Sequence, residues 1–273
     1  MTVLLAAVGD THIGSTVGLC TRRVALDDGG AYEASKSQRW LWSRWRAYWQ
    51  RVAELKTERG AQVVALMNGD LCDRNRHGHY QLWSINRASV KAAVLDCMQP
   101  LLDVADLVVV VRGTEAHTGE SAEMEEWLAG DIGAVPDEQA GTASWWYWEA
   151  TLGGYNVVAA HHPGTSSTRP WTQGGGANRR AAMLMAEYYG QRWQPNLGIF
   201  GHVHHNEDSF DNHPVRCVYN RAFSLRTAFD HRQGRSTQGV AVGGLIAEID
   251  AGELRNLYKL RYPLPRRKPW RMS

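Results

Sequence analysis

The first half of the chain alternates short apolar runs with longer segments in which apolar residues recur at helical spacing. Three runs, Val3–Val8, Gln62–Met67 and Asp106–Val111, are almost entirely apolar and predict strands that are covered on both faces. From Gln38 to Glu58 apolar residues recur every three or four positions, which predicts an amphipathic helix that ends at Gly60. The residues on its apolar side are Leu41, Trp45, Tyr48, Trp49, Val52 and Leu55. We therefore expect its tryptophans to lie in the core.

Two weaker helical patterns complete this half of the chain. Tyr80–Met98 predicts a helix that is stopped by Pro100, and Glu120–Leu128 predicts a short one. Because strands and helices alternate, the pattern predicts a parallel sheet. The segment Ile13–Ser37 is rich in Gly, Ser and Thr, so we expect an irregular insertion there.

The second half of the chain is predicted to be richer in β-hairpins. Ser144–Thr151 and Tyr155–Ala160 flank Gly153-Gly154, an arrangement that predicts a hairpin. A helix is expected at Ala177–Tyr189, and the remaining apolar runs predict short strands at Leu197–Phe200, Val215–Tyr219, Leu245–Asp250 and Leu254–Leu260. We find no internal repeat and no linker. Residues 1–265 are therefore predicted to form one domain, followed by a basic tail at residues 266–273.

Composition narrows the function classes. The 273 residues carry a formal net charge of +2, which is too small to argue for binding to nucleic acid. No apolar run is long enough to cross a membrane, and the N-terminus has no export signal. The four cysteines show no C-x-x-C spacing and are expected to be free thiols in a reducing compartment. The expectation is a cytoplasmic protein that makes no membrane contact.

Metal-ligand residues follow several of the apolar runs directly. They are Asp10, His12, Asp70, His161, His202 and His204. Because strand ends can converge at one edge of a sheet, we expect these six side chains to share a site. Asp10 and His12 alternate along an extended segment, as do His202 and His204, so each pair can point to one side. Carboxylates and imidazoles together are metal ligands, and there are enough of them for two metals.

The order of the motifs carries a family resemblance. Asp10-Thr-His12, Gly69-Asp70-Leu-Cys-Asp73, His161-His162-Pro163 and Gly201-His202-Val-His204 occur in the order D-x-H, G-D-x-x-D, H-x-P, G-H-x-H. Over roughly residues 3 to 250 the chain thereby resembles the calcineurin-like metallophosphoesterases. The resemblance implies an α/β fold, a two-sheet β-sandwich flanked by helices.

The same resemblance implies a centre for two divalent cations, Mn or Zn, with Fe as a further option. Asp70 would bridge both metals. The first metal would be completed by Asp10, His12 and His204, and the second by His161 and His202. Asp73 and His162 would lie behind the direct ligands, with Asp73 orienting a ligand histidine.

One family motif departs from the pattern. The family has G-N-H followed by D or E, whereas this chain has Gly113-Thr114-Glu115-Ala116-His117. His117 could turn inward and replace the missing ligand or the catalytic acid, or Thr114 or Glu115 could ligate the second metal. In a third alternative the second metal is weak or absent. The adjacent Arg112 could meet a phosphate or form a surface salt bridge.

The function implied is phosphoester hydrolysis through a metal-bridging hydroxide. Because the general acid is altered, diesters with good leaving groups or nucleotides are favoured over alkyl monoesters, and nucleic acid is a further substrate class. One alternative is a DNA-repair-type nuclease, which the low net charge disfavours. The other is a non-catalytic scaffold of the same fold, which would have no need for all six ligands.

Overall fold

Two β-sheets form the centre of the computed structural model, which describes residues 1–74, 81–165, 172, 174–228 and 241–265. The first sheet has the strand order β11-β10-β1-β4-β5 and the second the order β6-β7-β8-β9. The strands of the first sheet are β1 (Val3–Val8), β4 (Gln62–Asn68), β5 (Leu107–Val111), β10 (Ala241–Asp250) and β11 (Glu253–Pro263). Those of the second are β6 (Trp148–Leu152), β7 (Tyr155–Ala160), β8 (Leu197–Phe200) and β9 (Arg216–Tyr219).

Strand β1 shows how the layers form. Its side chains alternate between two separate cores, because successive residues of a strand face opposite sides of the sheet. Leu4, Ala6 and Val8 pack in the core beneath the helices α1 (Lys36–Arg59), α2 (Arg87–Leu102) and α4 (Glu123–Asp131). Their neighbours Val3, Leu5 and Ala7 pack between the two sheets, against Trp148, Val157, Ala159, Leu197 and Ile199.

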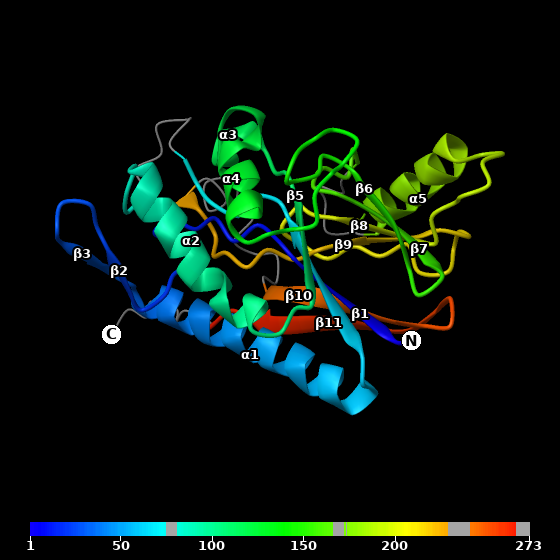
Figure 1. Cartoon of the computed structure of the whole chain (residues 1–273), viewed down its shortest axis with the longest axis horizontal. Helices are drawn as coiled ribbons and strands as arrows, with labels where there is room; N and C mark the ends of the chain where they lie inside the picture. The colour runs from blue at the N-terminus through cyan, green and yellow to red at the C-terminus, as the bar shows by residue number, and fades with distance from the viewer. Residues whose placement is uncertain (75–80, 166–171, 173, 229–240, 266–273) are drawn as a thin grey trace, which may run out of the picture.

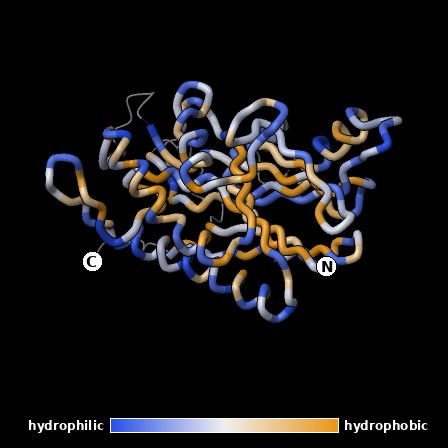
Figure 2. The backbone as a smooth tube through the Cα atoms, viewed as in Figure 1, coloured by the Kyte–Doolittle hydropathy of each residue, from blue (hydrophilic) through white to orange (hydrophobic). Residues whose placement is uncertain are grey.

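The helix α5 (Gly175–Glu187) covers the outer face of the second sheet through a third cluster that includes Ala177, Leu184 and Phe200. Figure 1 shows α1 and α2 beside the first sheet and α5 beside the second. Figure 2 shows hydrophobic residues concentrated along the central strands. The predicted fold class is confirmed: a mixed α/β sandwich of two sheets with helices on both outer faces.

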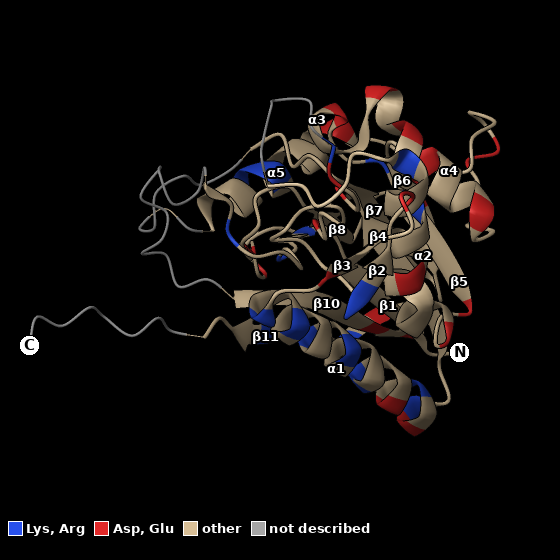
Figure 3. Ribbon diagram, turned by 90° about the vertical axis from the view of Figure 1, so that its left-hand side faces the viewer, with Lys and Arg blue, Asp and Glu red and all other residues tan. Residues whose placement is uncertain are grey.

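The long helix α1 is built as its sequence predicts. Ser35 and Gln38 form a capping box at its start, and Gly60 ends it in the left-handed conformation. Trp45 and Trp49 are buried, so they belong to the core as expected. Lys and Arg are spread along the same helix (Figure 3), and several of them pair with acids, for example Arg51 with Glu54.

The predicted helix at 80–98 is placed differently. The helix α2 begins only after Asn86, whose side chain accepts a hydrogen bond from the Ser89 amide. Pro100 does not stop it, contrary to the prediction. Proline removes one backbone donor, but the next turn still closes through the Asp103 amide to the Gln99 carbonyl, and Leu101 is buried.

Two further expectations are corrected by the structure. The segment 13–37 contains a short hairpin, β2 (Arg23–Ala25) with β3 (Ala31–Glu33). In the second half, 144–160 does form a hairpin, but β7, β8 and β9 run parallel, because α5 crosses over between β7 and β8. The predicted basic tail at 266–273 lies outside the described residues.

Candidate metal centre

The candidate ligands follow the carboxyl ends of parallel strands from both sheets. Asp10 comes after β1 and Asp70 after β4, which are parallel neighbours in the first sheet. His161 comes after β7, and His202 and His204 come after β8, which are parallel neighbours in the second sheet. Since carboxyl ends of parallel strands share one edge of a sheet, the two sheets present these side chains to a common point.

The six predicted ligand residues meet in space. Three groups have ligand atoms within 4.8 Å of one another: Asp10 with His12 and His204, His12 with Asp70 and His117, and Asp70 with His161 and His202. The Nε2 atom of His204 lies 3.2 Å from Asp10 Oδ1 and 3.2 Å from His12 Nε2. His161 Nε2 lies 3.1 Å from Asp70 Oδ2. The third group contains the residues expected at the second metal. The first group contains three of the four expected at the first metal, and the fourth, Asp70, shares the middle group with His12.

The site fits divalent cations because buried polar atoms in it have no hydrogen-bond partner. Asp10 and Asp70 are 0% and 1% exposed, and His161 is 2% exposed. Asp10 Oδ1 and His161 Nε2 are buried without a partner of hydrogen-bond geometry. His161 Nδ1 donates to the Asn68 carbonyl at 2.8 Å, which leaves Nε2 as the ring nitrogen that faces the carboxylates. Unpartnered buried oxygen and nitrogen atoms are costly, and a cation would satisfy them.

Strained turns, and not extended strands, bring the paired ligands together. Asp10, His12, Asp70, His202 and His204 all have positive φ, between 45° and 70°. Alternation along a strand was therefore the wrong reason for expecting each pair to face one side. Left-handed backbone at a non-glycine residue is costly and persists where the surroundings impose it. Here the Asp10 and His12 amides donate to the carbonyls of Gly69 and Asp70, which continues the β1–β4 pairing past the strand ends.

The surroundings in the site shift the pKa values of its histidines in opposite directions. Burial lowers the pKa of His161, but the carboxylates of Asp70 and Asp10 outweigh it and raise that pKa to about 10. Burial, together with the neighbouring histidines, lowers the pKa of His12 to about 4 and that of His202 to about 4. Metal ligation requires a neutral imidazole, so a cation would displace the proton of His161.

The altered third motif brings two residues to the site. The Thr114 amide and hydroxyl both donate to Asp70 Oδ1, at 2.6 and 2.9 Å. His117 Nδ1 lies 3.0 Å from Asp73 Oδ1, and its ring centroid lies 4.4 Å from that of His12. Thr114 thus contacts the predicted bridging carboxylate, and His117 belongs to a potential ligand group. Glu115 is exposed and, among the described residues, belongs to none of the three groups.

The remaining predicted residues lie around this centre. The His162 ring lies against that of His202, with centroids 4.1 Å apart and planes tilted by 47°, and His162 is not part of the three ligand groups found among the described residues. Arg112 is only 8% exposed and donates to Ser144 and Glu126. Its guanidinium therefore forms a partly buried ion pair with Glu126, whose side chain is 30% exposed, so of the two alternatives from the sequence the salt bridge is the one the structure contains.

One residue at the site carried no motif. Glu125, on the first turn of α4, is 1% exposed and accepts hydrogen bonds from the Leu71 and Gly113 amides. Burial and the nearby charge of Asp70 raise the pKa of Glu125 to about 7. An acid in the first turn of a helix ordinarily indicates only a favourable interaction with the helix dipole. No local signal in the sequence distinguished Glu125 from its acidic neighbours.

Comparisons with known proteins give the following picture. In sequence, the chain matches no protein-family model and no curated protein. Its structure is similar to Vps29 from Chaetomium thermophilum, at 12% identity over 96% of this chain and 98% of that chain, with a TM-score of 0.40. It is similar to a dimetal phosphatase from Danio rerio, at 10% identity over 96% and 99%, with a TM-score of 0.45.

A third similarity is to a 5'-nucleotidase from Candida albicans, at 9% identity over 81% of this chain and 45% of that chain, with a TM-score of 0.38. These TM-scores are below 0.5, so the inference about function rests on the geometry of the site. Among the described residues, none of the helices combines the length and apolar character needed to cross a membrane.

Proposed function

We propose that this chain is a calcineurin-like metallophosphoesterase that hydrolyses phosphoesters with two divalent cations, Mn or Zn, with Fe as a further option. The observation that carries the proposal is that Asp70 lies in two ligand groups, beside His12 in one and beside His161 and His202 in the other. A carboxylate shared in this way would bridge the two metals of a two-metal site. Asp10 and His204 would complete the first metal set together with His12.

Bound at these residues, two cations would activate water at neutral pH and stabilise charge on the phosphoryl oxygens. The chain's own residues supply the remaining functions. The Asp73 carboxylate accepts a hydrogen bond from His117 Nδ1, which fixes the ring and leaves Nε2 as the nitrogen that exchanges a proton. Burial would lower the pKa of His117, but its bond to Asp73 and the charge of Asp70 outweigh this and raise it. A raised pKa favours the protonated form of His117, which suits it to protonate a leaving oxygen.

The proposed substrate is a phosphodiester with a good leaving group, or a nucleotide. Thr114 stands where the family has an asparagine ligand, and its hydroxyl is engaged with Asp70. Because Glu115 stands where the family has its histidine acid, a poor leaving group such as an alkoxide would be protonated less effectively, which favours activated leaving groups. All four cysteines are free and buried, which suits a reducing compartment, and a cytoplasmic location belongs to the same proposal.

The test is hydrolysis of bis(p-nitrophenyl) phosphate and p-nitrophenyl phosphate by metal-stripped protein titrated with Mn²⁺ and then Zn²⁺. The unaltered chain should turn over the diester only with metal. His117→Ala should lower kcat, and by more for a phenyl ester than for a p-nitrophenyl ester, toward the loss of about 10²–10⁴-fold expected when a general acid is removed. His213→Ala is the matched control, because His213 lies outside all three ligand groups, and it should retain activity.

The scaffold alternative rests on Thr114, whose hydroxyl donates to the predicted bridging carboxylate in place of an asparagine that would ligate the metal. Two equivalents of bound metal without turnover of either ester would refute the hydrolase proposal and favour the scaffold. Equal activity of His117→Ala and His213→Ala would refute the role of His117 alone.

A further inference from the structure

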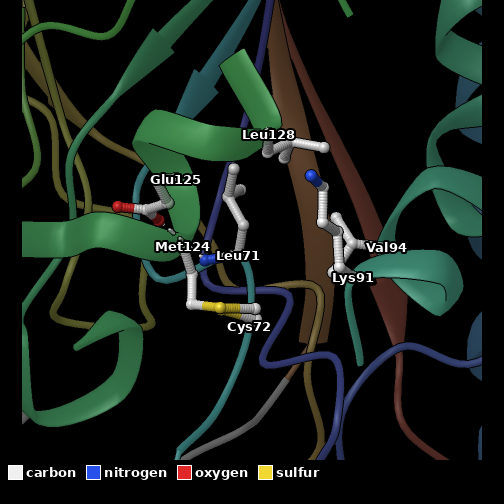
Figure 4. Close-up of a pocket in the computed structure, with 7 residues that line it drawn as sticks. All are labelled: Leu71, Cys72, Lys91, Val94, Met124, Glu125 and Leu128. Atoms are coloured by element: carbon white, nitrogen blue, oxygen red, sulfur yellow. Dashed lines mark hydrogen bonds between the residues drawn. The ribbon is translucent and has the colours of Figure 1, made fainter. Parts of the chain in front are cut away.

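Glu125 connects two of the loops that form the candidate metal centre. One carboxylate oxygen accepts from the Leu71 amide at 3.0 Å, and the other accepts from the Gly113 amide at 2.5 Å. Leu71 directly follows Asp70, and Gly113 directly precedes Thr114. Figure 4 shows Glu125 on its helix with the hydrogen bond to Leu71 drawn. A single buried side chain therefore holds the loop after β4 to the loop after β5.

The two loops are packed so closely that the distance between them can change little. A Cβ atom at Gly113 would lie 2.2 Å from the Asp70 amide nitrogen and 2.3 Å from Asp70 Oδ1. Thr114 donates twice to the same carboxylate oxygen. A change in the distance between the loops would therefore move Asp70 relative to its neighbours.

The direction of α4, the helix that carries Glu125, is set by left-handed backbone conformations directly before it. Ser121 and Ala122, directly before α4, both have positive φ, 51° and 54°. Met124 and Leu128 are buried and hold the helix in place. These two consecutive residues in the left-handed conformation direct the first turn of α4 toward the loops after β4 and β5.

The neighbouring acids have other partners. Glu123 pairs with Arg74 and Arg87, and Glu126 accepts from Arg112 and from the Ser144 amide. Of the three acids in the first turn of α4, Glu125 is the one hydrogen-bonded to both the loop after β4 and the loop after β5. Glu123 and Glu126 instead form ion pairs with arginine side chains.

We propose that Glu125 is a positioning residue that holds Asp70 and Thr114 at the spacing needed to bind two metals. The inference rests on the proposed function, because it assigns Glu125 to the same metal site. Each carboxylate oxygen accepts a hydrogen bond from one amide. Glutamine can accept at only one of its two terminal atoms, so Glu125→Gln leaves one amide without an acceptor.

The experiment measures metal binding directly, without substrate. The full-length chain, Glu125→Gln, Glu125→Ala and a control, Glu248→Gln, are stripped of metal and titrated with Zn²⁺ and with Co²⁺. Glu248 is also a buried acid, with Arg59, Asn256 and Tyr258 as partners, but it lies on β10 away from the site. We expect both Glu125 variants to bind Zn²⁺ about 10–100-fold more weakly, as is typical when the support of a metal ligand is removed. Their Co²⁺ absorption spectra should also change, because the ligand geometry changes.

The control separates positioning from general stability. Glu248→Gln is expected to lower the melting temperature of the metal-free chain while leaving metal affinity and the Co²⁺ spectrum unchanged. Zn²⁺ affinity within about twofold of the unaltered chain in both Glu125 variants would overturn the inference. So would an equal loss in Glu248→Gln, or the absence of metal binding by the unaltered chain, which would also overturn the proposed function. Metal binding without hydrolysis would overturn only the proposed function.

Discussion

Replacing Gly69 with alanine tests the geometry of the site most directly. Gly69 has a φ of +72°, and a Cβ atom there would lie 2.4 Å from His161 Nδ1 and 2.8 Å from the Gly113 Cα. The His161 ring cannot easily move aside, because it is buried and bonded to the Asn68 carbonyl. The methyl group must therefore displace either a candidate metal ligand or the backbone of the next loop.

The expected cost has two parts. The left-handed conformation costs an alanine about 1–2 kcal/mol, and overpacking of a tight interior typically adds about 1–3 kcal/mol. Gly60→Ala is the matched control, since Gly60 also has positive φ, +57°, but nothing lies within 4 Å of its Cβ position. Gly60→Ala should show only the first cost, with unchanged metal binding.

Urea unfolding of the metal-free proteins gives both free energies, and calorimetric titration with Zn²⁺ gives the affinity. Gly69→Ala should unfold more readily than Gly60→Ala by about 1–3 kcal/mol and should bind metal at least about tenfold more weakly. The reasoning is refuted if the two variants unfold within about 0.5 kcal/mol of each other, the range of ordinary surface substitutions, and bind metal equally well.

Three further predictions concern stability. Saturating Mn²⁺ or Zn²⁺ at about 100 times Kd should raise the free energy of unfolding by about 2.7 kcal/mol, and excess EDTA should reverse the gain; a metal-independent melting temperature would contradict this. Tyr48→Phe removes the hydroxyl that donates to the buried Leu245 carbonyl at 2.6 Å, and it should cost about 1 kcal/mol in urea unfolding, whereas a neutral effect would show that this bond contributes nothing. Burial would raise the pKa of Asp208, but hydrogen bonds from Arg216 and Lys259 outweigh it and lower that pKa. A lowered pKa in the folded state contributes stability at neutral pH that is lost as pH falls below 3.8. Asp208→Asn should therefore be destabilising in urea unfolding at pH 7, with the difference shrinking in acid, and a difference that stays constant with pH would exclude this linkage.

Local patterns were sufficient for most of the secondary structure. Apolar runs and helical spacing predicted β1, α1 and β8 closely, because burial on one or both faces leaves a repeat that can be seen along the chain. The ends of α2 were predicted less well, since its start depends on the Asn86 cap and its continuation past Pro100 on packing. The parallel run of β7, β8 and β9 also went unseen, because strand pairing joins distant segments.

The sequence by itself determined which residues carry the candidate chemistry. Aspartate and histidine placed after strands at Asp10, Asp70 and His161 are informative because the ends of parallel strands converge, whatever the loops between them do. His161 Nε2 lies 3.9 Å from Asp10 Oδ1 and 3.1 Å from Asp70 Oδ2, and this convergence follows from that rule.

Only the tertiary structure decided how the site is completed. His117 reaches the centre through Asp73, which is 44 residues away, and Glu125 reaches the Leu71 amide across 54 residues. Arg112 forms a partly buried ion pair with Glu126. These contacts form between elements that are distant in the sequence, and they depend on how those elements pack. Packing of this kind produces no periodic or local pattern in the sequence, so it can be seen only in the folded chain.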